Sequence, residues 1–88
     1  MKYYHTTTVK RTGSNSLCFY VPQAWGLEIG TEVNVEIRKA DATENDPVFS
    51  YVSTIRRAST TAQKLTIPKF FGLAVGDWVT YDIWPIGV

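Results

Sequence analysis

The sequence contains the same unit twice, with an offset of 46 residues from Pro22 to Pro68. The stretch "VPQAWGLEIGTEVNVEI" (21–37) recurs as "IPKFFGLAVGDWVTYDI" (67–83), with the proline, both glycines and the alternating apolar residues in register. Further identities at the same offset are Thr8/Thr54 and Arg11/Arg57. Self-similarity of this kind constrains the fold more than composition does. The chain must fold as two copies of one supersecondary unit.

Each copy contains the same order of predicted elements. A first strand, rich in β-branched and aromatic residues, covers residues 4–11 and 50–57. After a polar loop, apolar residues alternate in a second strand that ends at Pro22 or Pro68, where proline favours the first position of a short helical turn. A glycine corner then leads to a third strand over residues 33–37 and 79–83. We therefore predict an all-β fold with two short helical turns, built from ββαβ repeats at 3–38 and 49–84 and a linker at 39–48.

Length and composition support one small domain that spans residues 1–88. The chain has 88 residues and a single cysteine, Cys18, so an intramolecular disulfide and a multi-cysteine metal cage are impossible within one chain. No apolar run approaches the roughly 20 residues that cross a bilayer, and the start of the chain does not resemble a signal peptide. We expect a cytoplasmic protein without metal or cofactor.

Charge is distributed in alternating blocks, although the net charge is only +1. Residues 1–27 and 47–76 contain lysine and arginine but no aspartate or glutamate. Residues 28–46 contain six acidic residues, and residues 77–88 contain only Asp77 and Asp82 as charged side chains. This pattern is compatible with an ordinary solubilising surface or with basic faces set against acidic ones.

The motifs "KRTGSNSLCFYVP", "GLEIGTEVNVEI" and the second copy "STIRRASTTAQKLTIPKFFGLAVGDWVTYDI" resemble the AbrB/MazE/SpoVT family of swapped-hairpin DNA-binding domains. The resemblance covers about 30 residues of each copy. It implies a swapped-hairpin AbrB-like β-barrel whose two repeats are related by a pseudo-twofold axis. The family's helix after the proline is usually about one turn longer, and its chains usually hold one unit and dimerise. Two fused units imply a monomer that acts as a pseudo-dimer, with a homodimer of such monomers left open.

The resemblance also implies that duplex DNA is the partner, contacted by basic and polar residues of the first two strands and their loop. Arginine and lysine displace counterions from phosphates, and short polar groups reach base edges. Arg11 and Arg57 are the strongest candidates because they occupy equivalent positions in the two copies. The candidate DNA-binding residues are Lys10, Arg11, Ser14, Asn15, Arg56, Arg57, Thr60, Thr61 and Lys64.

Other interpretations of the same residues remain open. The arginines could be solvated strand ends, and Ser14 and Asn15 could simply form a turn. The fold could be a protein-interaction module, antitoxin-like, that binds a partner through acidic third strands and does not bind DNA. An enzyme is the least supported class: a decarboxylase among the related double-psi barrels cleaves itself at Gly-Ser, but one dipeptide, Gly13-Ser14, carries almost no weight. We expect a DNA-binding transcriptional regulator rather than an enzyme.

Overall fold

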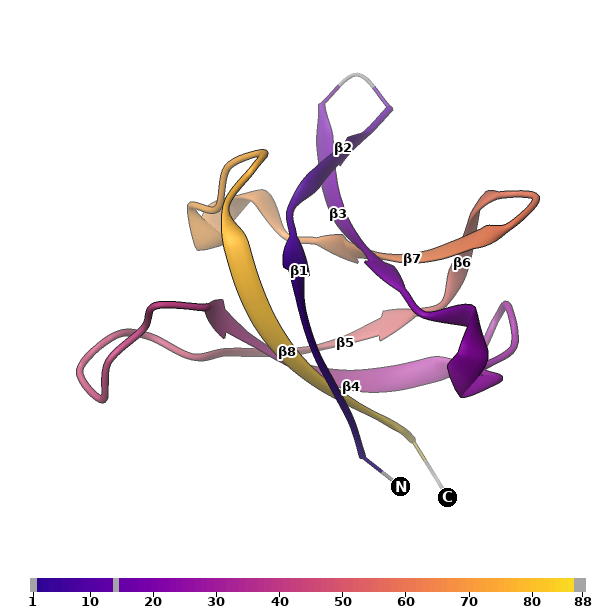
Figure 1. Cartoon of the computed structure of the whole chain (residues 1–88), viewed down its shortest axis with the longest axis horizontal. Coiled ribbons are helices and arrows are strands. Elements are labelled where there is room, and N and C mark those ends of the chain that lie inside the picture. Colours follow the sequence, from indigo (N-terminus) through magenta and orange to yellow (C-terminus); the bar gives the residue numbers. More distant parts are fainter. Residues whose placement is uncertain (1, 14, 87–88) are drawn as a thin grey trace.

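The protein folds into two antiparallel four-stranded sheets (Figure 1). The structure, a computed structural model, describes residues 2–13 and 15–86. The β4–β8 sheet has the strand order β1-β8-β4-β5, and the β3–β7 sheet has the order β2-β3-β7-β6. The strands are β1 (Tyr3–Thr8), β2 (Lys10–Thr12), β3 (Ser16–Val21), β4 (Glu32–Lys39), β5 (Phe49–Thr54), β6 (Arg56–Ser59), β7 (Ala62–Ile67) and β8 (Trp78–Pro85). The predicted all-β class is confirmed at this level.

The ladders repeat at the offset seen in the sequence. The pair Tyr3–Ile83 of β1 and β8 recurs as Phe49–Ile37 of β5 and β4, and the remaining pairs of these two ladders follow in the same way. In the central ladders, Phe19 faces its own equivalent, Leu65, and Glu36 faces Asp82. The first strand of each half therefore pairs with the third strand of the other half.

Two short 3-10 turns link the sheets, as the prolines predict. Turn η1 (Gln23–Trp25) follows Pro22, and turn η2 (Lys69–Phe71) follows Pro68. Gly26 and Gly72 end these turns in the left-handed conformation, with φ of 70° and 76°. This conformation is strained for residues with a Cβ, so glycine is the expected residue at both positions.

The predicted first strands are wrong in one respect: each is two strands that belong to different sheets. The expected strand at 4–11 is interrupted at Val9, and the one at 50–57 at Ile55. Val9 pairs with the glycine corner instead, since its N–H donates to Asp77 O at 2.9 Å and its carbonyl accepts from Gly76 N at 2.9 Å. Ile55 makes the same two bonds with Thr31 and Gly30. The glycine corners thus redirect each first strand from one sheet to the other.

The core lies between the two sheets and consists of equivalent pairs from the two halves together with Leu73, whose equivalent Leu27 is only partly buried. The paired side chains come from the alternating positions of the strands and from both sheet-switching residues. The buried pairs are Val9/Ile55, Phe19/Leu65, Val21/Ile67, Val33/Val79, Val35/Tyr81 and Ile37/Ile83. Trp25 stacks on Tyr3 in one half, as Phe71 stacks on Phe49 in the other. In the part of the chain that the structure describes, no helix is long and apolar enough to cross a membrane.

Candidate nucleic-acid interface

Positive charge is concentrated in the β3–β7 sheet. Its four strands contain no aspartate or glutamate. They hold five of the nine lysines and arginines of the chain, namely Lys10, Arg11, Arg56, Arg57 and Lys64. The fold thus collects the basic segments of both halves on one sheet, and the acidic residues of the strands all fall on the β4–β8 sheet.

These cations lie in two hairpins, β2–β3 and β6–β7, that project at neighbouring corners of the molecule (Figure 1). Lys10 of β2 faces Cys18 of β3, and Arg56 of β6 faces Lys64 of β7. Because Phe19 and Leu65 point into the core, their neighbours along the strands point outward. Lys10, Arg56 and Lys64 therefore share the outer face of the β3–β7 sheet.

Arg11 and Arg57 occupy the opposite face of the same hairpins. Arg11 pairs with Leu17, and Arg57 pairs with Gln63 at the equivalent position. Both arginines are exposed even though they lie on the face of the hairpins that continues into the core side of the sheet. Each hairpin therefore carries basic side chains on both of its faces.

Gln63 holds the base of the β6–β7 hairpin against the other half of the molecule. Its Nε2 donates to Leu27 O at 2.8 Å. Its Oε1 is buried and has no hydrogen-bond partner among the described residues. The equivalent position in the first half is Leu17, which packs against the core. The two hairpins are thus anchored by different means.

The hairpin tips hold the remaining candidates. Asn15, Thr60 and Thr61 are exposed, and Ser14 lies outside the described residues. Gly13 adopts a left-handed φ of 66° at the tip of the β2–β3 hairpin. The β6–β7 ladder instead has an irregularity between Arg57 and Ser59 before the tip. The structure thus groups the described candidates on two hairpins, with polar groups at the tips and cations along the strands.

Tyr20 is a surface residue of this sheet that the candidate set omits. It is 41% exposed, pairs with Lys64 across the β3–β7 ladder, and lies 5.6 Å from the Lys10 Nζ, measured to its ring centroid. Lys64 Nζ crosses β3 to donate to Thr12 Oγ1, and Lys10 Nζ donates to Thr8 Oγ1 at 3.1 Å. The sequence did contain a signal for Tyr20, because an aromatic residue between the inward-facing Phe19 and Val21 is expected to lie on the outer face of the strand.

Cys18 lies beneath these lysines. It is 1% exposed, and burial raises the pKa of its thiol, although Lys64 and Lys10 oppose that rise. A buried thiol with a raised pKa is a packing group rather than a nucleophile. Among the described residues, no group of three or more His, Cys, Asp or Glu side chains is arranged to hold a metal.

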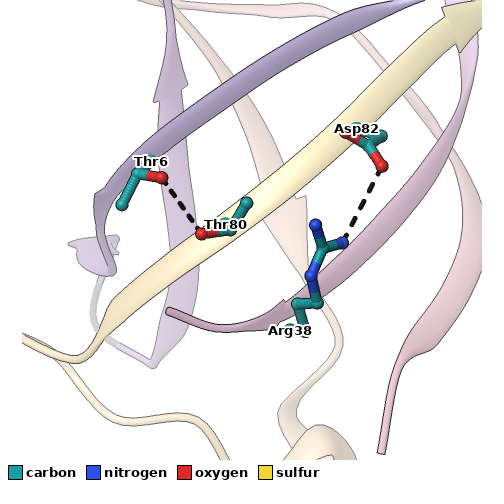
Figure 2. A network of polar contacts seen from close by, with 4 residues as sticks. All are labelled: Thr6, Arg38, Thr80 and Asp82. Atoms are coloured by element: carbon teal, nitrogen blue, oxygen red, sulfur yellow. Dashed lines mark hydrogen bonds and ion pairs between the residues drawn. The ribbon is translucent and has the colours of Figure 1, made fainter. Parts of the chain in front are cut away.

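The outer face of the β4–β8 sheet has a different chemistry. Glu36 faces Asp82 across the central ladder, and Arg38 Nη1 lies 3.8 Å from Asp82 Oδ2 (Figure 2). Thr6 and Thr80 share a hydrogen bond of 3.0 Å on the same face (Figure 2). Like charges directly opposite each other destabilise a ladder, so Arg38 offsets part of that repulsion.

Comparisons with known proteins give no relative for this chain: no family model, no curated protein and no solved structure matches it. The resemblance to AbrB-like domains therefore rests on the sequence motifs.

Proposed function

We propose that this protein binds double-stranded DNA through its two basic hairpins and acts as a transcriptional regulator. The observation that carries the proposal is the separation of charge: the β3–β7 sheet holds five cations and no acidic residue in its strands. Such a surface attracts the phosphate backbone, and the release of condensed counterions supplies the affinity.

The shape of the hairpins favours binding in the major groove of DNA. A two-stranded β-ribbon fits the major groove of B-DNA. Because each hairpin has cations on both faces, Lys10 and Arg11 can reach phosphates on either wall while Asn15 approaches the base edges.

The pairing of the strands also supports the proposed swapped-hairpin architecture. Strand β1 pairs with β8, and β5 pairs with β4, so the first strand of each half lies beside the third strand of the other. We propose that the two halves form a pseudo-twofold AbrB-like barrel of which the β3–β7 sheet is the DNA-binding side. The fused pair would then act as the dimer does in single-unit chains.

The test removes equal charge from each sheet. Arg11→Ala/Arg57→Ala takes two exposed cations from the hairpins. Arg38→Ala/Lys39→Ala takes two from the end of β4 and serves as the matched control. In a fluorescence-anisotropy titration with labelled mixed-sequence duplex, the hairpin variant should bind about 30- to 150-fold more weakly than wild type, because two phosphate contacts of roughly 1–1.5 kcal/mol each are lost. The control should bind within about threefold of wild type.

Equal losses in the two variants would contradict a hairpin interface and leave only a general charge effect. Circular dichroism of both variants checks that each keeps the strand content of the wild type. Binding that survives the hairpin substitutions would exclude Arg11 and Arg57 from the interface.

A second candidate function is a protein-interaction module that uses the outer face of the β4–β8 sheet. Glu36 and Asp82 lie there beside Tyr4, which pairs with Asp82 and is 63% accessible, and Trp78, which is 62% accessible, lies four residues from Asp82 on the same face of β8. Exposed aromatic residues are enriched at protein interfaces. Folded protein that ignores duplex DNA even at low salt would favour this function over DNA binding.

A further inference from the structure

The two hairpins share two equivalent pairs of cations, but their tips differ. Lys10 and Arg11 have Arg56 and Arg57 at the equivalent positions. Asn15, by contrast, is equivalent to Thr61, which is exposed in the same way. The contacts that these four cations can make to phosphate are therefore matched between the halves, whereas the groups available to bases differ.

The backbones of the tips differ as well. Gly13, with a φ of 66°, closes the β2–β3 hairpin, where Thr12 and Ser16 form the last pair. The β6–β7 hairpin ends in the pair Ser59–Ala62 after its irregularity. There Ser59 Oγ accepts a hydrogen bond from the Thr61 backbone N–H at 3.3 Å. The described residues that flank the two tips thus differ in backbone conformation and in pairing.

The outer face of the β3–β7 sheet is also unlike across the pseudo-twofold axis. Lys64 is equivalent to Cys18, and Tyr20 is equivalent to Thr66. The pair Tyr20–Lys64 therefore puts a ring and a charge on one side of the axis, whereas the equivalent pair Thr66–Cys18 on the other side has neither. Lys64 Nζ crosses β3 to Thr12, which brings a second lysine to the side of the sheet that holds Lys10. Positive charge on this face is therefore not twofold symmetric.

We propose that the DNA target is an asymmetric duplex with two unlike half-sites, and that Asn15 and Thr61 distinguish them. This inference rests on the proposed DNA binding. An asparagine amide both donates and accepts, and it pairs bidentately with adenine, whereas threonine offers one hydroxyl and a methyl group that suits thymine. The matched arginines hold both hairpins on phosphates, and the two tips read different bases.

The test is a selection from a randomised duplex library on the full-length protein, followed by competition between defined duplexes. The wild type should enrich a non-palindromic sequence. It should bind that sequence roughly 5- to 150-fold more tightly than a palindrome made from either half-site, since a bidentate base contact discriminates by this factor.

The variant Thr61→Asn gives both tips the same side chain while leaving the backbone bond to Ser59 available. Its selected sequence should change in one half-site only and acquire adenine at the position equivalent to that read by Asn15. Thr43→Asn makes the same substitution at an exposed linker position and should select the wild-type sequence.

A palindromic wild-type consensus, or retention of DNA without enrichment of any sequence, would overturn this inference and leave DNA binding intact. A Thr61→Asn consensus identical to that of the wild type would overturn the role of Thr61. Failure to retain any duplex at low salt would overturn the proposed function, and this inference with it.

Discussion

At the scale of single residues, the two halves form the same hydrogen bond with different side chains. The carbonyls of Tyr20 and Thr66 are equivalent, and each accepts a hydrogen bond from a tyrosine hydroxyl. The donor is Tyr81 of β8 in one half, at 3.2 Å, and Tyr51 of β5 in the other, at 2.9 Å. The donor therefore comes from a third strand in one case and from a first strand in the other. The repeat conserves the bond but not the residue.

These tyrosines predict a loss of stability at alkaline pH. Burial raises the pKa of both phenols above the ordinary value near 10. Above about pH 10 the unfolded chain releases these protons and the folded protein retains them, so the free energy of unfolding must fall as pH rises. Below pH 10 the stability is fully present. Urea denaturation at several pH values measures the fall.

The variants Tyr51→Phe and Tyr81→Phe should each lower the free energy of unfolding by about 1 kcal/mol at neutral pH and flatten the alkaline slope. Tyr4→Phe serves as the control, because that side chain is 63% exposed, and it should change neither quantity. An alkaline slope unchanged in both buried variants would contradict this account.

The sequence predicts those properties of single residues that depend on the local pattern, and it does not predict those that depend on which strands become neighbours. The alternation of apolar residues, and their recurrence at the offset, was sufficient to predict inward positions such as Phe19 and Ile83. The partners of the tyrosine hydroxyls depend on which strands lie side by side, and no local pattern encodes that. Tyr20 was missed for the related reason that its neighbour Lys64 is distant in sequence and adjacent only in the ladder.

At the scale of elements, the glycine corners and 3-10 turns determine how each strand passes between the sheets. The sequence predicted the turns at Pro22 and Pro68 correctly, because proline and glycine act locally. It did not predict the sheet switch at Val9, since a valine in a β-branched run looks like any strand residue. The switch is caused by hydrogen bonds to the corner at Gly76, which is remote in the chain.

Substitution of the turn glycines tests this role. A Cβ added at Gly72 would meet no atom within 4 Å, so the cost of Gly72→Ala comes from its φ of 76° alone. We expect a loss of about 1–2 kcal/mol in the free energy of unfolding, measured by denaturant titration. Gly72→Asn should cost less, because asparagine tolerates the left-handed region. Gly26→Ala should match Gly72→Ala, and a neutral result at both positions would contradict the assigned role.

At the scale of the whole molecule, the ladders join the two halves more than they hold each half together. The ladders β1–β8, β4–β5, β4–β8 and β3–β7 all connect residues of different halves. Only β2–β3 and β6–β7 lie within one half, and these are the basic hairpins. The linker at 39–48 is thus not what holds the halves together.

Cleavage of the backbone in the linker should therefore leave the fold intact. With a protease site inserted at residues 43–46, which are exposed, the cut fragments should elute together at the volume of the uncut protein on size exclusion. Their circular dichroism should match that of the uncut chain. Fragments that separate without denaturant would show that the ladders between halves are too weak to hold the fold.

The central claim is that the β3–β7 sheet binds duplex DNA by neutralising phosphates, and the salt dependence of binding tests it most directly. For five cations in contact with phosphate, the plot of log affinity against log salt concentration should have a slope of about −4.5, and Arg11→Ala/Arg57→Ala should reduce its magnitude by about two. Binding that is absent at low ionic strength, or whose slope is near zero, would contradict the claim.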